Sequence, residues 1–385
     1  MSNLKVAGPG KKILWGICGI GMGHTYRQLP LLLHFAAYCR IVILAYGESF
    51  KFYEKHFSGH ERVTVLPVVV PYLVGSRTGL DFEATATALA NQGLDFSVNW
   101  RSLARVQEIL GKPDLVISDY EPVSAQYAYS QGAPLVTIDQ QSKYLCGDFP
   151  EELGGQGYLD ECQRLRLFFP RAAARLAVSF FRVPPCPQRQ GQEEVTLFAP
   201  VINQAVRSLH RRKAADSKLS IVVYISSQKD FVQPLGDLLA QFGQLPDIEF
   251  ALFLPAGLMA GPELEAGKPA NVLLYKHGSA EFHKHLERAD GLVSTAGHTL
   301  LAEAMYLGIP TYAVPLPVYE QVMNAHVIDR SGFGVSRQTV VVDELQSFIA
   351  RLPEFARAIA ADTDVLMRGS AEADLISLLH ERFLA

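Results

Sequence analysis

The sequence has no excess of basic residues, no closely spaced cysteine pair and no long apolar run. Its 35 Lys and Arg residues are balanced by 39 Asp and Glu residues, whereas nucleic acids favour strongly basic surfaces. None of the five cysteines forms a C-x-x-C pair, which excludes a zinc knuckle and a dithiol motif: Cys18, Cys39, Cys146, Cys162 and Cys186. No apolar run reaches the ~18 residues that span a bilayer, and the polar start "MSNLKVAGPGKK" lacks the apolar core of a signal peptide. We expect a cytoplasmic protein with reduced thiols and no nucleic-acid partner.

Short β-branched and apolar runs alternate with helix-like segments, and this pattern restarts in the second half of the 385-residue chain. Such runs are typical of strands buried on both faces of a parallel sheet. The expected strands are 12–18, 39–47, 62–70, 113–119 and 133–139, followed by 219–227, 248–255, 271–276, 291–297 and 309–315. The polar, basic stretch "SLHRRKAADSK" (208–218) is the best linker candidate. The sequence therefore predicts an α/β protein with two doubly wound domains that face each other across a cleft.

Most of the unusual residue choices fall in the loops that follow these strands, where open α/β sheets bind their ligands. The first such loop is "GIGMGH" (19–24), between a strand and a helix. A glycine loop in this position usually holds a phosphate, and its dinucleotide form is G-x-G-x-x-G. The first two glycines of this form are Gly19 and Gly21, and the loop also contains Gly23, but His24 stands at the third glycine position. The titratable imidazole predicts a chemical role for this loop.

The segment 293–334 combines a second turn with polar residues at fixed spacing. A strand leads through a small-residue turn that contains Gly297 into a helix with Thr299 near its first turn. The N–H groups and the positive dipole end of that helix suit a diphosphate. Glu303, about one turn into the helix, can accept hydrogen bonds from vicinal sugar hydroxyls.

A carboxylate and an amide follow the next strand, where Glu320 and Gln321 are expected together on a loop and suit the hydroxyls of a second sugar. The series "STAGHTLLAEA", "GIP" and "EQVMNA" resembles the donor-binding half of GT-B glycosyltransferases. It is closest to the branch of the peptidoglycan N-acetylglucosaminyltransferase and the UDP-glucuronosyl- and UDP-glucosyltransferases. In the first half, "GIGMGHTYR", "PDLVISDYEP" and "APLVTIDQQ" resemble the same branch in the same order.

The resemblance covers roughly residues 12–335 and is poor at about 150–215. It implies a GT-B fold with an acceptor-binding Rossmann-like domain at 1–210 and a nucleotide-sugar-binding one at 217–360. A helix within 361–385 would pack back on the first domain. By the same resemblance the donor is a nucleotide sugar, most simply a UDP-sugar, and no cofactor or metal is needed.

Carried over to this sequence, the resemblance implies that the donor diphosphate is bound at the turn of Thr295, Gly297, His298 and Thr299. Glu303 would bind the ribose, and Glu320 and Gln321 would contact the transferred sugar. The base would be bound by the loop "KHGSAEF" (276–282), which contains Gly278 and Phe282. Thr295 stands where the plant-type version has its phosphate-binding histidine.

The same resemblance makes His24 the catalytic residue that faces the acceptor. An inverting transfer needs a base within ~3 Å of the acceptor hydroxyl, and an imidazole of ordinary pKa near ~6.5 suits neutral pH. Asp119, at the end of its strand, can accept from the other ring nitrogen and so fix the tautomer. Glu121, two residues later, remains an alternative partner.

Two metal-like patterns are interpreted as ordinary surface. His277, His283 and His285 are expected on helix or loop surface, because no carboxylate or cysteine completes a metal set. The string "DTD" (362–364) mimics the metal motif of the other glycosyltransferase architecture, but we expect it on the surface of a C-terminal helix.

The acceptor is the least specified part of the sequence. The segment 164–184, "RLRLFFPRAAARLAVSFFRVP", has five arginines, four phenylalanines and no acidic residue. This composition fits a peripheral membrane contact, as a lipid-linked acceptor would need, but a buried strand "LAVSFF" between basic loops is the favoured interpretation. Small molecules and glycans remain alternative acceptors.

The function predicted from the sequence is sugar transfer from a nucleotide sugar to an acceptor hydroxyl, with His24 as the base. One alternative is a nucleotide-sugar epimerase of the same architecture. Another is a non-catalytic protein that binds sugar nucleotides. A different residue type at position 24 or 303 would have favoured this alternative, but His24 and Glu303 are both present.

Overall fold

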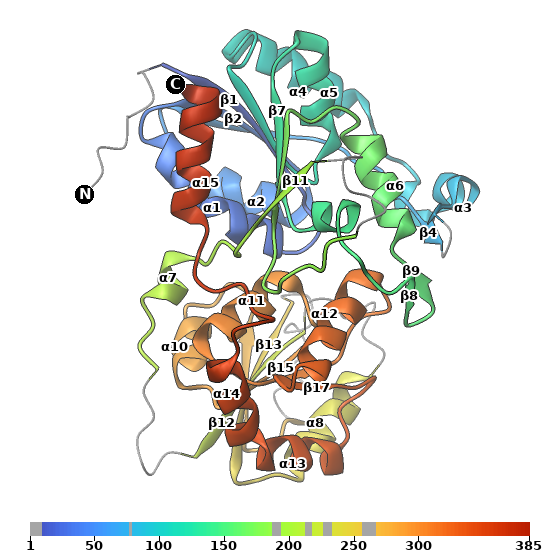
Figure 1. The fold of residues 1–385 in the computed structure, drawn as a ribbon, viewed down its shortest axis with the longest axis vertical. Helices are drawn as coiled ribbons and strands as arrows, with labels where there is room; N and C mark the ends of the chain where they lie inside the picture. The colour runs from blue at the N-terminus through green and yellow to red at the C-terminus, as the bar shows by residue number, and fades with distance from the viewer. Residues whose placement is uncertain (1–9, 77–78, 187–193, 212–217, 226–232, 256–266) are drawn as a thin grey trace. The chain divides into compact units, whose positions relative to one another are not determined.

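The structure is a computed structural model that describes residues 10–76, 79–186, 194–211, 218–225, 233–255 and 267–385. The chain divides into two compact units (Figure 1). Unit 1 comprises the residues up to Ser179, Val183–Asn203 and Gly369–Ala385, and unit 2 comprises Phe180–Arg182 and Gln204–Arg368. The middle of the expected linker, 212–217, and the end of the expected strand 219–227 lie outside the described residues.

Unit 1 contains a seven-stranded parallel sheet in the order β11-β10-β7-β6-β1-β2-β3. Its strands are β1 (Lys12–Ile17), β2 (Arg40–Ala45), β3 (Val63–Pro67), β6 (Leu115–Asp119), β7 (Leu135–Asp139), β10 (Ala174–Val178) and β11 (Val195–Phe198). The helices are α1 (Gly23–Ala36), α2 (Gly47–His56), α3 (Phe82–Thr87), α4 (Ser97–Ile109), α5 (Pro122–Gln131), α6 (Leu159–Phe168) and α15 (Glu372–Leu379). The described part of unit 1 also contains short elements: β4 (Gly75–Ser76), β5 (Gly79–Leu80), β8 (Glu152–Leu153), β9 (Gln156–Gly157), η1 (Leu89–Asn91), η2 (Gln141–Leu145) and the π-helical η5 (His380–Leu384).

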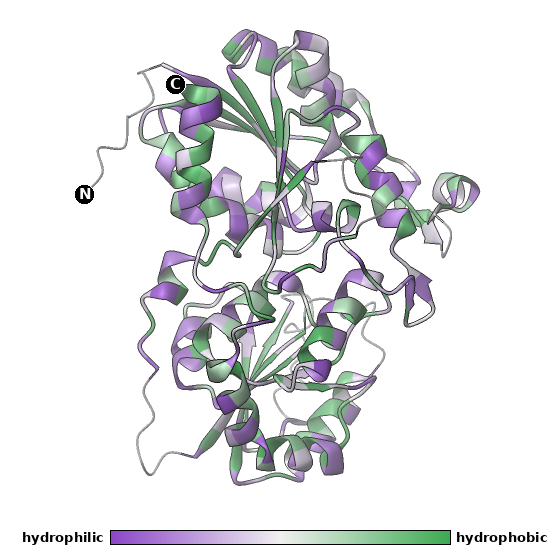
Figure 2. Ribbon diagram, in the orientation of Figure 1, coloured by the Kyte–Doolittle hydropathy of each residue, from purple (hydrophilic) through white to green (hydrophobic). Residues whose placement is uncertain are grey.

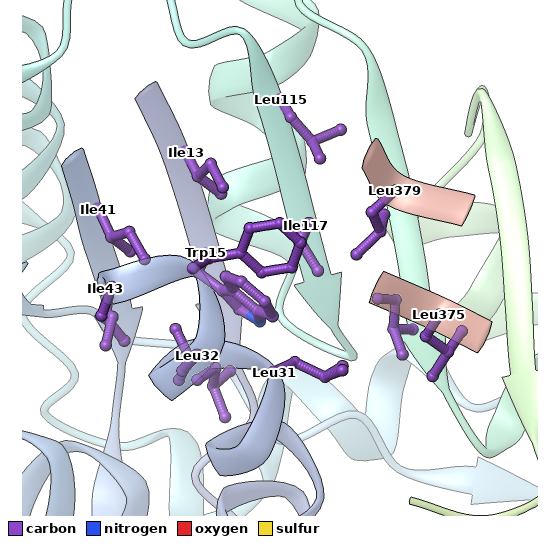
Figure 3. Close-up of a cluster of buried hydrophobic side chains, with 14 of the residues drawn as sticks. Ile13, Trp15, Leu31, Leu32, Ile41, Ile43, Leu115, Ile117, Leu375 and Leu379 are labelled. Carbon is purple, nitrogen blue, oxygen red and sulfur yellow. The ribbon is translucent and has the colours of Figure 1, made fainter. Parts of the chain in front are cut away.

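The core of unit 1 forms because its central strands are apolar on both faces. Trp15 of β1 is fully buried, and Figure 3 shows it among Ile13, Ile117 and the leucines of α1. Leu375 and Leu379 of α15 belong to the same cluster, so the C-terminal helix packs on this sheet. Figure 2 shows the strands as hydrophobic and the helices as mixed, as expected of a sheet between amphipathic helices.

Unit 2 contains a six-stranded parallel sheet in the order β14-β13-β12-β15-β16-β17, with a buried core of its own. Its strands are β12 (Leu219–Tyr224), β13 (Ile248–Leu254), β14 (Val272–Lys276), β15 (Gly291–Ser294), β16 (Thr311–Ala313) and β17 (Gly334–Ser336). Its helices are α7 (Gln204–Arg207), α8 (Leu235–Gly243), α10 (Glu281–Arg288), α11 (His298–Leu307), α12 (Tyr319–Arg330), α13 (Val342–Ala350) and α14 (Leu352–Ala361).

Both sheets follow a doubly wound order, in which the chain moves to one side of the first strand and then to the other. The expected strands are all present, and the predicted α/β class is confirmed. The segment "LAVSFF" contributes to β10, and Phe180 and Phe181 are buried, so these aromatic residues pack inside the protein. Within the described ranges, no helix has the length and apolar character needed to cross a bilayer.

Candidate functional site

The first candidate site lies where the doubly wound order of unit 1 reverses, between β1 and β6. Two glycines shape the loop that follows β1. A side chain at position 19 would clash with the backbone, because a Cβ on Gly19 would lie only 1.9 Å from the Tyr46 carbonyl oxygen. Gly21 has a φ of +69°, in the left-handed region that favours glycine. The loop turns sharply into α1, which carries His24 in its first turn beside Asp119 at the end of β6.

A hydrogen bond joins the two residues expected to form the catalytic pair. Nδ1 of His24 lies 2.8 Å from Oδ1 of Asp119. Arg27 donates to both carboxylate oxygens, from Nη2 at 2.6 Å and from Nε at 2.9 Å, and Gln28 donates from Nε2 at 2.8 Å. Nη2 of Arg27 also lies 2.8 Å from Nδ1 of His24. Because an ionised carboxylate only accepts, Nδ1 carries a proton and donates it to Asp119.

The charges around this pair favour its ionised form. Burial alone would raise the pKa of Asp119. The positive charges and hydrogen bonds of Arg27 and His24 outweigh burial and lower this pKa to about 2. Burial opposes protonation of His24, but the charges of Cys18 and Asp119 outweigh it and raise the pKa of His24 to about 10. The His24 side chain keeps 14% of its surface exposed, whereas Asp119 is fully buried. His24 is therefore a strong base that is held in one orientation.

The residues after Asp119 have separate tasks. Tyr120 has a φ of +57°, in a region that non-glycine residues rarely occupy, and its ring stacks on His24 with 6.4 Å between centroids. Its hydroxyl donates to Glu161. The Glu121 carboxylate accepts from the backbone N–H groups of residues 123 and 124 at the start of α5. Glu121 thus caps a helix, whereas the His24 imidazole contacts Asp119 and Arg27.

The second candidate site follows β15 in unit 2. Thr295 is buried, Ala296 has a φ of +61° and Gly297 precedes the first residue of α11. Asn324 of α12, itself fully buried, donates from Nδ2 to the Ala296 carbonyl oxygen at 3.0 Å. This contact fixes the strained turn, which directs the N-terminal end of α11 and its positive dipole at the space beyond the strand.

His298 and Glu303 both lie on α11 and are both buried. Nε2 of His298 accepts a hydrogen bond of 3.3 Å from the backbone N–H of Phe180, so the neutral ring carries its proton on Nδ1. Burial raises the pKa of Glu303 to about 8. Thr299 is half-buried in the first turn of the same helix.

Glu320 and Gln321 differ from their expected setting. They were predicted on a loop after the strand, but they lie in the first turn of α12. Gln321 folds back and accepts from the backbone N–H of Leu316 through Oε1 at 2.9 Å, which holds the preceding "PLPV" segment. The helix begins early because Val318 is extended and the following residues suit helix formation.

The predicted base-binding loop ends in a group of aromatic rings. Gly278 has a φ of +75° in the turn after β14, while Phe282 is already part of α10 and packs edge-on against Tyr224 and Phe253. The His277 ring stacks on Tyr224 at 4.3 Å between centroids and 5° between planes. These rings surround the carboxyl ends of β12, β13 and β14.

Two of the expected surface features are wrong in detail. His285 is buried, and its Nε2 lies 3.0 Å from the Tyr275 hydroxyl, because the apolar face of α10 turns it towards the sheet. The "DTD" string does not lie on a helix: it follows α14, and Asp362 accepts from the backbone N–H groups of Val365 and Leu366 in a turn. Across the residues that are described, no group of three or more His, Cys, Asp or Glu side chains is placed to hold a metal ion.

Four residues that shape these sites were not identified from the sequence. Arg27 and Gln28 lie three and four positions after His24, on the same helix face, and this spacing is a signal that could have found them. Asn324 lies in the "EQVMNA" block, but the sequence did not predict a role for its side chain. Ala296 gave no signal, because nothing in an alanine indicates a positive φ.

Comparison with known proteins identifies relatives along most of the chain. The sequence profile described as glycosyl transferase family 1 matches residues 11–353. An uncharacterized glycosyltransferase of Methanosarcina mazei is 26% identical over 341 residues, which are 84% of each chain. One from Methanosarcina acetivorans is 24% identical over 351 residues, again 84% of each chain.

Solved structures share the fold at low sequence identity. The glycosyltransferase of kitacinnamycin matches with a TM-score of 0.64 and 16% identity, over 98% of this chain and 100% of that one. UGT71G1 of Medicago truncatula, complexed with UDP-glucose, matches with a TM-score of 0.61 and 13% identity, over 98% and 99%. MurG of Acinetobacter baumannii matches with a TM-score of 0.56 and 16% identity, over 96% and 99%. The fold is therefore of the GT-B type.

Proposed function

Because this chain belongs to glycosyl transferase family 1, we propose that it moves a hexosyl group from a UDP-sugar to an acceptor hydroxyl, with inversion at the anomeric carbon. The observation that carries the proposal is the 2.8 Å hydrogen bond between His24 and Asp119 at the switch point of the first sheet. A base that is oriented by a buried carboxylate is what abstraction of a hydroxyl proton requires.

In the proposed step, Nε2 of His24 takes the proton of the acceptor hydroxyl as the hydroxyl oxygen attacks the anomeric carbon. The bond between that carbon and the diphosphate oxygen breaks, and the nucleoside diphosphate leaves with the electron pair. Asp119 accepts from Nδ1 throughout, so it keeps the ring in place and stabilises the imidazolium that forms. The acceptor is a small molecule, a glycan or a lipid-linked sugar.

The raised pKa of His24 sets a condition on this step. With a pKa of about 10, the imidazole holds its proton in most molecules at pH 7. Only the neutral form can act as a base, so transfer should become faster as the pH rises towards 10.

The donor would be held by unit 2. The N-terminal end of α11 with Thr295, Gly297 and Thr299 would receive the diphosphate, and Glu303 would accept from the ribose hydroxyls. The helix dipole and backbone N–H groups supply positive charge for the leaving diphosphate, so the proposal is a metal-independent transfer. Glu320 would contact the transferred sugar, and Gly278 and Phe282 would bind the base.

The test is a panel of UDP-, GDP- and dTDP-sugars, with thermal stabilisation measured for binding and proton NMR for the products. We expect stabilisation by UDP-sugars, and a freshly formed product whose anomeric configuration is opposite to that of the donor. A product with retained configuration contradicts the inverting mechanism. Release of an epimerised sugar without transfer supports the epimerase alternative, and stabilisation by no nucleotide sugar overturns the proposal.

A further inference from the structure

Tyr120 combines an unusual backbone conformation with a place beside the candidate base. Its φ is +57°, and among the described residues of unit 1 it is the only residue other than glycine with a positive φ. A glycine would adopt this conformation without the steric cost that a tyrosine carries. Residues held in such conformations cluster at functional sites. The turn after β6 does not require a tyrosine, so the reason for this residue lies in its side chain.

The Tyr120 ring restrains the imidazole that Asp119 orients. The 2.8 Å contact with Asp119 fixes Nδ1 of His24, but the ring plane can still swing about this contact, because the last side-chain torsion of histidine is soft. The Tyr120 ring lies alongside the imidazole, with 6.4 Å between centroids and 23° between planes, which is within the range of attractive aromatic pairs. A nearly parallel ring in this position limits both the swing of the imidazole and the access of water to it.

Helix α6 holds the Tyr120 side chain through two contacts. The Tyr120 hydroxyl donates to the Glu161 carboxylate, and the Phe168 ring packs edge-on against the Tyr120 ring at 5.7 Å between centroids. Burial and the negative charge of Glu161 raise the pKa of Tyr120 above its ordinary value, so the hydroxyl keeps its proton for this hydrogen bond. Glu161 lies in the first turn of α6 and Phe168 is its last residue. One helix therefore fixes where the Tyr120 ring lies.

The Glu161 carboxylate is itself held by ion pairs that are largely shielded from water. Arg164 donates from Nη1 to Glu161 at 2.9 Å and from Nη2 to Asp160 at 2.8 Å, and these side chains are only 13% to 18% exposed. Nη2 of Arg164 also donates to the Leu73 carbonyl oxygen at 3.3 Å, which ties α6 to the chain after β3. Partly buried ion pairs are screened less than exposed ones. The Tyr120 hydroxyl thus has an acceptor with a fixed position.

We propose that Tyr120 is a positioning residue for the base, whose ring holds the His24 imidazole in the plane in which Nδ1 faces Asp119 and Nε2 faces the acceptor. This inference rests on the proposed role of His24. The hydrogen bond to Asp119 decides which nitrogen faces the acceptor, and the Tyr120 ring limits how far that nitrogen moves. Displacement of a catalytic group by about 1 Å can cost about 10²-fold in rate, so this restraint bears directly on transfer.

The test is the exchange of the His24 Nδ1 proton with water, followed by NMR on the full chain labelled with 15N-histidine. His24→Gln identifies the resonance by its loss. Tyr120→Gly and Tyr120→Asn remove the phenol ring and place residues that tolerate a positive φ, whereas Tyr120→Phe keeps a ring. The matched control is Tyr127→Phe, which removes another hydroxyl of unit 1 that contacts Gln107 and the Gly111 carbonyl oxygen.

We expect slow exchange in the native chain, because Asp119 accepts this proton and the Tyr120 ring limits access to it. Exchange should be at least about tenfold faster in Tyr120→Gly and Tyr120→Asn, and native in Tyr120→Phe and Tyr127→Phe. Native exchange in the glycine and asparagine variants overturns the proposal. Rapid exchange in the native chain does so as well, and so does equal acceleration in Tyr127→Phe, which would report a general loosening of unit 1.

UDP release from the UDP-sugar that stabilises the native chain measures the consequence for catalysis. In Tyr120→Gly, kcat should fall by about tenfold or more while UDP affinity stays native, since a displaced base slows the chemical step and leaves the donor bound. Native kcat in a variant with fast exchange would show that the ring shields His24 without positioning it, and would overturn the proposal. If the native chain turns over no UDP-sugar, the proposed function fails, while proton exchange still decides whether Tyr120 restrains His24.

Discussion

His24 and Asp119 are 95 positions apart in the sequence, yet Nδ1 of the histidine lies 2.8 Å from Oδ1 of the aspartate. The doubly wound order places the ends of β1 and β6 side by side, and the glycine loop then turns His24 towards the carboxylate. The partners of Asp119 lie on the same face of α1, where Arg27 and Gln28 leave the carboxylate with four donor contacts.

Replacing Asp119 with Asn should slow transfer and move its pH dependence. The amide removes one of the two negative charges that raise the pKa of His24, so the rise of kcat/KM with pH should shift to lower pH. The loss of imidazolium stabilisation should lower the maximal rate by about 10²-fold or more. Because Arg27 loses its charged partner, a drop in thermal stability is expected as well. An unchanged pH profile in a folded variant would contradict the proposed pairing.

Donor binding should release a proton from Glu303. At pH 7 a carboxyl group with a pKa of about 8 is mostly protonated, whereas the ribose hydroxyls are best bound by its ionised form. Calorimetry of UDP binding in buffers of different ionisation enthalpy should therefore report close to one proton released at pH 7, and affinity should increase as the pH rises through 8.

Two substitutions test whether Glu303 is the source of that proton. Glu303→Gln should abolish the release and weaken binding. The control Glu354→Gln changes an exposed residue of α14 whose pKa is lowered by its contact with Arg351, so it should change neither quantity. Proton release that persists in Glu303→Gln would assign the proton to another group.

Asn324→Ala should weaken donor binding through the turn that it supports. The variant leaves the buried carbonyl of Ala296 without this donor, which costs about 1–3 kcal/mol of stability, and frees the strained turn before α11. UDP affinity should fall several-fold. Asn271→Ala is the control, because this asparagine also donates to backbone carbonyls of unit 2, at Phe242, Leu245 and Ile248, and should reduce stability without changing UDP affinity. Equal UDP affinity in the two variants would show that the turn does not hold the donor.

The sequence predicted the strands well because they are apolar on both faces and therefore leave a long, continuous signal. It did not indicate β17, which has only three residues, or β11, which has four, because such runs are too short to distinguish from loops. The environment of each site residue was less predictable. The sequence places Glu303 on a helix but does not indicate that it is buried, since burial on a helix depends on which elements pack against it.

The roles of individual residues were likewise predictable only in part. The pairing of His24 with Asp119 could be expected because both follow strands of one parallel sheet, and strand ends meet at one edge. The helix-capping role of Glu121 was not distinguished from a histidine partner, because a residue after a strand can face either way. The positive φ values of Tyr120 and Ala296 had no sequence signature at all.

If His24 is the base for sugar transfer, its substitution should slow transfer without weakening donor binding. We would measure UDP release from the UDP-sugar that stabilises the protein, with His24→Ala compared against His60→Ala, an exposed histidine of the same unit. We predict that release by His24→Ala falls by about 10²–10⁴-fold while UDP affinity stays at its native value, and that His60→Ala keeps native activity. Native rates of release in a folded His24→Ala variant would show that His24 is not the base.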